Sequence, residues 1–84
     1  MKHEIKILPE YFEAVACGAK KFELRKNDRC YEVGDTVILR EWNGFEYTGD
    51  EVAVTITYVL KSCPEYGLEK GYCIFGWQEV RNDT

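Results

Sequence analysis

The segment from residue 18 to residue 25 holds the side chains best suited to chemistry. It reads Gly-Ala-Lys-Lys-Phe-Glu-Leu-Arg, in which Lys20, Glu23 and Arg25 offer an ammonium group, a carboxylate acceptor and a planar fork of five donors. Such a set can recognise a phosphate or a polar planar ligand, whereas a purely structural strand has little need of it. The segment therefore predicts a binding site.

The roles of these three side chains stay open at this stage. Lys20 could bind a phosphate, or act in an enzyme as nucleophile or base with Glu23 as its partner. Glu23 and Arg25 share one strand face, so they could equally form a surface ion pair worth under about 1 kcal/mol. Strict alternation places Lys20 on the same face as Phe22, so the three charged groups meet only if the chain bends after Gly18.

Further charged residues are candidates to support this site. Lys6 and Arg29 add positive charge, with Arg29 placed in a turn. Glu41 alternates in step with the apolar residues Val37 and Leu39, so a regular strand points its carboxylate inward. A buried carboxylate must be paired or hydrogen-bonded, and Lys6, Lys20 or Arg25 could serve as its partner. Glu41 is then either a site residue or an acid that lines the mouth of the fold. The predicted ligand-binding set is Lys6, Lys20, Glu23, Arg25, Arg29 and Glu41.

Other residues with chemical potential have simpler explanations. His3 ends a strand face that it shares with Ile5 and Ile7, which favours a packed or hydrogen-bonded residue at the edge of the core over a catalytic one. The aromatic residues of segment 42–47 flank a turn and could stack on a base, or cover one end of the fold.

The charge of the chain restricts the class of partner. A net charge of −4 argues against an extended nucleic-acid surface, because such binding depends mainly on neutralising phosphates. Residues 20–29 nevertheless contain five basic and two acidic side chains. A compact positive patch on an acidic body suits an anion or nucleotide site better than a long duplex groove.

The cysteines and the hydropathy indicate the compartment. No two of the four cysteines form a C-x-x-C pair, and His3 is far from all of them in the sequence, so we expect free, buried thiols and no metal. No stretch approaches the ~20 apolar residues of a membrane helix, and the first residues lack the apolar region of a signal peptide. We expect a cytoplasmic protein without a cofactor or a membrane partner, and the sequence leaves the oligomeric state open.

The elements that must position the site are short. Pro9 predicts the start of a helix of about two turns, which Gly18 ends in a left-handed conformation. In the longest predicted strand the even-numbered residues share one face, and residues 62–71 read as a loop. Strands are predicted at residues 3–8, 21–26, 36–42, 52–60 and 72–77.

The composition is enough for one small domain. With 45% hydrophobic residues, we expect a single domain over residues 1–80 and a tail at 81–84. One helix is too few for repeated βαβ units, so the sheet should be largely antiparallel. Short strands hide their edges best by closing on themselves. The predicted fold is therefore mainly β (α+β), a small β-barrel of five to six strands with one short helix packed against it.

The motif Gly18-x-Lys20-x-x-Glu23-x-Arg25 resembles the hallmark of the ASCH (activating signal cointegrator homology) family, which has a PUA-like barrel fold. Further matches lie at residues 3–7, in the Pro-Glu-Tyr-Phe start of the helix, at residues 25–29, in Val-Gly-Asp at 33–35 and near Tyr58. The resemblance covers nearly the whole chain. It looks like a small prokaryotic and phage branch that has no assigned biochemical function.

The resemblance implies RNA or nucleotide binding, because PUA-like barrels commonly recognise RNA. One ASCH branch instead hydrolyses N4-acylated cytidines with a lysine, a threonine and a glutamate. Its lysine matches Lys20, but Glu23 stands in place of the threonine, and the helical insertion that supplies the glutamate is missing here. We therefore expect a module that binds RNA or a modified nucleotide in a charged cleft.

Two alternatives to this module remain. The first is a small amidohydrolase that acts on an N-acylated nucleoside such as N4-acetylcytidine, with Lys20 as nucleophile or base and Glu23 or Glu41 as its acid–base partner. The second is a barrel that binds another protein.

Overall fold

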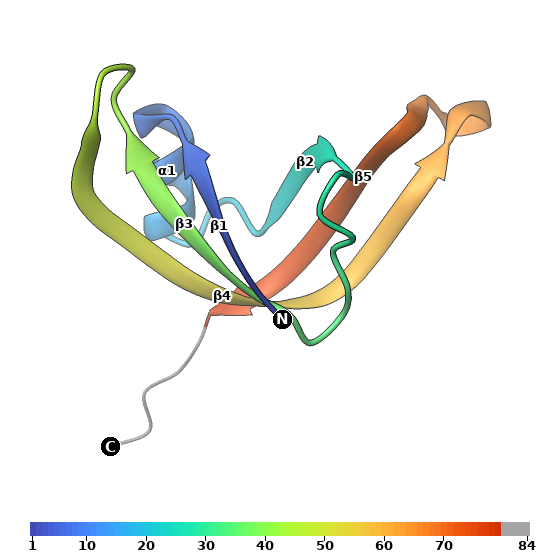
Figure 1. Cartoon of the computed structure of the whole chain (residues 1–84), viewed down its shortest axis with the longest axis horizontal. Helices are drawn as coiled ribbons and strands as arrows, with labels where there is room; N and C mark the ends of the chain where they lie inside the picture. Colours follow the sequence, from blue (N-terminus) through green and yellow to red (C-terminus); the bar gives the residue numbers. More distant parts are fainter. Residues whose placement is uncertain (80–84) are drawn as a thin grey trace.

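A curved sheet of five strands with one short helix beside it forms the fold, in a computed structural model that describes residues 1–79 (Figure 1). The elements in chain order are β1 (Lys2–Ile7), α1 (Pro9–Ala16), β2 (Phe22–Lys26), β3 (Thr36–Trp42), β4 (Tyr47–Cys63), the 3-10 turn η1 (Pro64–Tyr66) and β5 (Leu68–Glu79).

The sheet has the strand order β1-β3-β4-β5-β2, with β1 parallel to β3 and the other neighbours antiparallel. The long strand β4 bends along the bottom of Figure 1, pairing with β3 in its first part and with β5 in its second. The mainly β fold with one short helix is confirmed. The expected closure was wrong: β1 and β2 are the two edges, they do not pair, and the sheet is not closed into a barrel.

The core fills the inside of the curve and includes the buried face of α1. Phe12 and Val15 of α1 pack there against side chains of β1, β3, β4 and β5. The helix ends at Ala16, and Gly18 follows it with a left-handed φ of 83°, as predicted. The amide of Gly18 donates to the Val15 carbonyl and that of Ala19 to the Ala14 carbonyl, which satisfies groups that the helix end would leave unpaired.

Two features of β4 and β5 differ from the sequence prediction. The expected loop at 62–71 is mostly strand, with only η1 and the left-handed Gly67 between β4 and β5. The register of β4 against β5 shifts between Ile56 and Tyr58. This bulge reverses the alternation, so Tyr58 faces outward while Val59 packs against the core. The prediction that all even-numbered residues of this strand share one face was wrong after residue 56.

Several other predictions can be compared with the described residues. The thiols are free, as expected, but only Cys73 is buried, and burial raises its pKa; Cys17 and Cys30 are exposed. No helix within residues 1–79 is long and apolar enough to cross a membrane. The predicted domain end at residue 80 and the tail at 81–84 lie outside the described residues.

Candidate functional site

Strand β2 turns the side chains of Glu23 and Arg25 toward the inside of the curved sheet. Glu23 is only 9% exposed, whereas its neighbours Phe22 and Leu24 are 52% and 54% exposed. This arrangement reverses the usual placement of apolar and charged residues on a strand. A buried carboxylate is tolerated only when it is paired, so the partners of Glu23 determine what this strand can do.

Glu23 is held by two cations, one on each carboxylate oxygen. Lys20 Nζ contacts Oε1, and Arg25 Nε donates to Oε2 over 3.1 Å. The bend at Gly18 makes this possible, because it releases Lys20 from the alternation of the strand. The three charged groups of the motif therefore meet.

Aromatic rings surround the Lys20 ammonium group. Its Nζ lies 5.7 Å from the ring centroid of Tyr11, 5.5 Å from that of Phe22 and 5.8 Å from that of Trp77. Cations within about 6 Å of a ring centroid are attracted to the ring face. The side chain is 16% exposed, so Lys20 is held in one position rather than moving freely in solvent.

Two arginines bridge the gap between the sheet edges β1 and β2, which we call the seam. Arg25 Nη2 donates to the carbonyl of Lys6, and Arg29 Nη1 donates to the carbonyl of Glu4 over 2.7 Å. These carbonyls belong to β1, an edge strand whose backbone groups on that side have no neighbouring strand. Side-chain donors thus take the place of the backbone pairing that would have closed the barrel.

A hollow of about 550 Å³, the seam pocket, opens beside these groups. Four of its lining side chains are cationic and only Glu23 is acidic, so the pocket attracts anions. Tyr11 and Tyr72 add planar surfaces. The lining residues are Lys6, Ile7, Leu8, Tyr11, Lys20, Glu23, Leu24, Arg25, Lys26 and Tyr72.

The seam pocket gathers four of the six predicted ligand-binding residues, namely Lys6, Lys20, Glu23 and Arg25. Arg29 and Glu41 do not line it. Arg29 is committed to β1, and Glu41 is half-buried and accepts a hydrogen bond from Thr48 Oγ1 at 2.7 Å. The expected pairing of Glu41 with Lys6, Lys20 or Arg25 was wrong, because the register of β3 against β4 shifts beside it, between residues 40 and 42.

Three of the aromatic or charged residues that line the pocket were not predicted from the sequence: Tyr11, Lys26 and Tyr72. Lys26 belongs to the positive patch at residues 20–29, and that charge was the signal available. Tyr72 lies opposite Lys26 in the register of β2 and β5, a pairing that the sequence does not reveal. Tyr11 reads as part of an apolar helix stripe but is 49% exposed.

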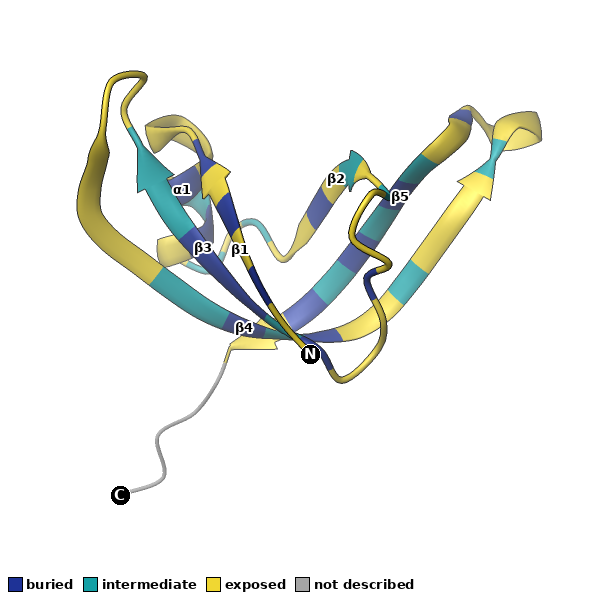
Figure 2. Ribbon diagram, viewed as in Figure 1, coloured by how far each residue is buried: buried dark blue, intermediate teal, exposed yellow. Residues whose placement is uncertain are grey.

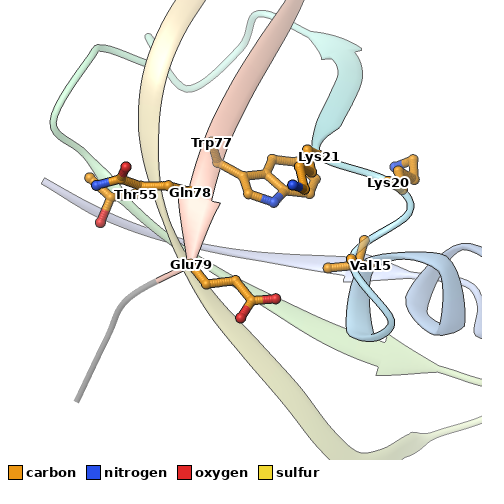
Figure 3. A pocket seen from close by; sticks show the side chains of 8 residues that line it. Val15, Lys20, Lys21, Thr55, Trp77, Gln78 and Glu79 are labelled. Atoms are coloured by element: carbon orange, nitrogen blue, oxygen red, sulfur yellow. The ribbon is translucent and has the colours of Figure 1, made fainter. Parts of the chain in front are cut away.

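Another hollow, of about 730 Å³, lies beyond Lys20 between α1 and the end of β5 (Figure 3). Trp77, Gln78 and Glu79 form part of its wall, and Glu79 extends toward Val15 in Figure 3. Of the predicted site residues it contains only Lys20. Glu79 is also the last residue that the structure describes, so the seam pocket is the better candidate site.

A separate ionic cluster, the Asp35 corner, ties the start of β1 to the turn before β3. Asp35 Oδ1 lies 3.1 Å from the N-terminal ammonium group of Met1, and Oδ2 lies 2.8 Å from His3 Nε2. The amide of Glu32 also donates to Oδ2. The bond to His3, followed by that to the ammonium group, holds the pKa of the Asp35 carboxyl below its usual range. His3 is therefore the packed, hydrogen-bonded residue that the sequence favours.

The Tyr31 ring fills the space behind this corner. Its centroid is 4.7 Å from the rings of both His3 and Phe75. Burial raises the pKa of the Tyr31 hydroxyl, and this effect outweighs the positive charges of Arg25 and Arg29, which lower that pKa. That hydroxyl is buried and has no hydrogen-bond partner within residues 1–79.

The aromatic side chains before and after the β3–β4 turn are engaged with cations. Lys6 Nζ lies 4.1 Å from the Trp42 ring centroid, and the Arg40 guanidinium lies 3.9 Å from that of Tyr47. Trp42 and Tyr47 also meet edge to face at 5.1 Å. These contacts agree with a covering role, and stacking of a base here stays a prediction.

Comparison with known proteins gives a family. The family model described as "Domain of unknown function (DUF3850)" matches residues 2–77. An "Uncharacterized 12.9 kDa protein in GpA 3'region" of Escherichia phage P2 is 49% identical over 57 residues, which make up 68% of this chain and 52% of that protein. The chain thus spans about half the length of this curated relative. Since the family model covers nearly all of the chain, the protein belongs to the DUF3850 family.

Proposed function

We propose that the chain binds a nucleotide, free or as part of single-stranded RNA, in the seam pocket. The observation that carries the proposal is the inward turn of β2, which places buried Glu23 and its two cations against a hollow that holds further positive charge. A charged strand face directed into a pocket is difficult to explain by stability alone, because buried ion pairs are weak sources of stability.

The pocket offers distinct groups for distinct parts of a nucleotide. Lys6, Arg25 and Lys26 supply donors for a phosphate, and Tyr72 supplies a planar surface for a base. Glu23 has about four acceptor positions on its two oxygens. Lys20 and Arg25 use only part of this capacity, so an exocyclic amine of the base can donate to the same carboxylate.

The size of the pocket and the charge of the chain limit the ligand. A volume of about 550 Å³ lies within the range of roughly 300–1,000 Å³ that is typical of small-molecule sites. One nucleotide is suited to such a space, whereas the net charge of −4 disfavours a long duplex. The resemblance to ASCH domains, itself a proposal, supports the same class of ligand.

The test is a binding titration with two probes, cytidine 5′-monophosphate and a pool of short single-stranded RNAs of random sequence, each at low and high salt. We expect binding that weakens with salt and that falls at least about tenfold in Arg25→Ala. Arg29→Ala is the matched control, because it also loses a hydrogen bond to a β1 carbonyl but lies outside the pocket. Binding that is indifferent both to salt and to Arg25→Ala would contradict the proposal.

The contact between Lys20 and Glu23 favours one second candidate, hydrolysis of an N-acylated nucleoside. In that reaction water cleaves the amide of N4-acetylcytidine into cytidine and acetate, with Lys20 as nucleophile or base and Glu23 as its proton partner. The assay follows release of cytidine. Turnover that is unchanged in Lys20→Ala would exclude this chemistry.

A further inference from the structure

The outer face of β2, β5 and β4 carries an apolar patch that stays exposed. The strand registers align its residues in two rows, each running across the three strands. Phe22, Leu24 and Tyr58 are 52%, 54% and 65% exposed, and Figure 2 shows the second part of β4 as largely exposed. We call this surface the outer patch; its rows are Phe22, Gly76 and Tyr58, and Leu24, Ile74 and Leu60.

The outer patch follows from the reversal of β2. Because the inward face of this strand is occupied by Glu23 and Arg25, its apolar residues Phe22 and Leu24 are forced outward. They align with the apolar side chains that β5 and β4 direct to the same side. Contiguous apolar surface of this kind marks an interaction site when it is concentrated in one place.

Gly76, in the middle of the outer patch, lies opposite Tyr58, next to the bulge between Ile56 and Tyr58. Of the seven glycines, six have a positive φ that favours glycine, and Gly76 does not. A Cβ atom at Gly76 would meet nothing closer than the Lys21 carbonyl oxygen at 3.7 Å, which is an ordinary contact. Glycine inside a strand costs conformational entropy, and it often marks a bulge or the close approach of another molecule. Here it leaves a notch between Phe22 and Tyr58.

We propose that the outer patch is the interface of a two-fold homodimer in which Ile74 of each copy fills the notch at the partner's Gly76. The two-fold axis lies in the interface, perpendicular to the strands and midway between the two rows. The Phe22 row of one copy then packs against the Leu24 row of its partner, and the reverse. Phe22 then faces the partner's Leu24, and Tyr58 faces the partner's Leu60. The projection and the notch belong to the same surface, and this self-complementarity is what a two-fold interface requires.

The area and the charge of the outer patch agree with a second copy as the occupant. Aromatic side chains present about 150–250 Å² each, and with the exposed fractions the outer patch offers about 400 Å² of apolar surface. A stable dimer buries about 800 Å² per partner, with an apolar centre and a polar rim. None of the six residues is charged, so the axis brings no like charges together within the patch.

The dimer would also cover the outer face of β2, including Leu24, which lines the seam pocket as well. This short edge strand carries Glu23 and Arg25, and it pairs with a neighbour only at β5. Packing of its outer residues against a second copy would restrain the strand that positions the site. The dimer does not depend on the proposed ligand, so either proposal can fail without the other.

The experiment measures the mass of the full chain in solution by sedimentation and light scattering over a concentration series. We expect twice the chain mass for the wild type, and the single-chain mass for Tyr58→Lys and for Gly76→Leu. Tyr58 is already exposed, and a Cβ atom at Gly76 would make only an ordinary contact in its own chain, so we expect both variants to fold, as circular dichroism can verify. Phe45→Lys is the matched control, because Phe45 is 90% exposed on the β3–β4 turn, outside the outer patch.

A wild type that remains a single chain at every concentration overturns the proposal. So does a dimer that persists in Tyr58→Lys or Gly76→Leu, or one that is lost in Phe45→Lys. Loss of the dimer in the two patch variants together with its retention in the control supports the proposal.

Discussion

Asp35 and Glu23 are both buried carboxylates with a nitrogen partner on each oxygen, yet they lie in different surroundings. Asp35 is 7% exposed and binds His3 and the N-terminal ammonium group. Glu23 is 9% exposed and binds Lys20 and Arg25. Beside the Asp35 corner the ring of a tyrosine fills the space, whereas beside Glu23 the seam pocket opens.

The two carboxylates show how a similar arrangement can serve the fold or a ligand. At the Asp35 corner the bonds of the carboxylate join β1 to the turn before β3, and one oxygen also accepts from a backbone amide. At Glu23 the pairs hold a strand edge, and Lys6 and Lys26 add charge that the carboxylate does not neutralise. Space and surplus charge distinguish a candidate site from a structural ion pair.

The largest expected effect is on the Asp35 side. Asp35→Asn keeps the shape of the side chain but removes the charge that His3 and the ammonium group share, so we expect the free energy of unfolding to fall by about 2–3 kcal/mol. Glu23→Gln should cost less than half of this, because the open pocket lets water reach Lys20 and Arg25. Urea unfolding at neutral pH measures both values. Equal losses would remove the distinction between the two carboxylates.

Acid should erase the effect of Asp35→Asn. The folded pKa of Asp35 lies below its unfolded value of about 3.9, so its stabilisation is complete above that pH and is lost as the pH falls through the folded pKa. The melting temperatures of the wild type and Asp35→Asn should therefore differ at neutral pH and converge in strong acid. Thermal unfolding over a pH series tests this. A gap that stays constant down to the lowest pH would show that the carboxylate charge is not the cause.

A smaller effect is expected on ligand binding at the rim of the pocket. Lys6→Ala removes one of several cations, so we expect binding of the RNA pool to weaken by about fivefold. Lys2→Ala is the control on the same strand, because Lys2 is exposed and does not line the pocket. The same titration as above compares them. Equal weakening in both variants would indicate a general charge effect rather than a site.

The smallest effect is expected for Tyr31→Phe. The hydroxyl has no partner within residues 1–79, so its removal should change the free energy of unfolding by less than about 0.5 kcal/mol. Urea unfolding measures this as well. A loss of more than about 1 kcal/mol would show that the hydroxyl is hydrogen-bonded, and that the Asp35 corner extends to it.

The local elements could be predicted from the sequence, and the arrangements between distant segments could not. Alternation and Pro9 identify β1 and α1, and Gly18 fixes the bend that brings Lys20 to Glu23. Alternation also gives the two faces of β2, but it does not say which face is inside. That choice depends on whether Glu23 finds partners.

Pairings across the chain account for most of the errors. Closure of the barrel would require backbone hydrogen bonds between β1 and β2. Here the side chains of Arg25 and Arg29 bridge the seam instead. The bulge between Ile56 and Tyr58 arises from the pairing of β4 with β5, which the alternation of a single strand does not reveal. The role of Asp35 likewise rests on His3, 32 residues away in the sequence.

The most direct test of the seam pocket as the ligand site is a titration of ¹⁵N-labelled protein with the single-stranded RNA pool, followed by NMR. The account predicts amide shifts concentrated at Lys6, at residues 20–26 and at Tyr72, with His3 and Asp35 unchanged. Shifts concentrated at the Asp35 corner or on the β3–β4 turn, or no shifts at all, would contradict it.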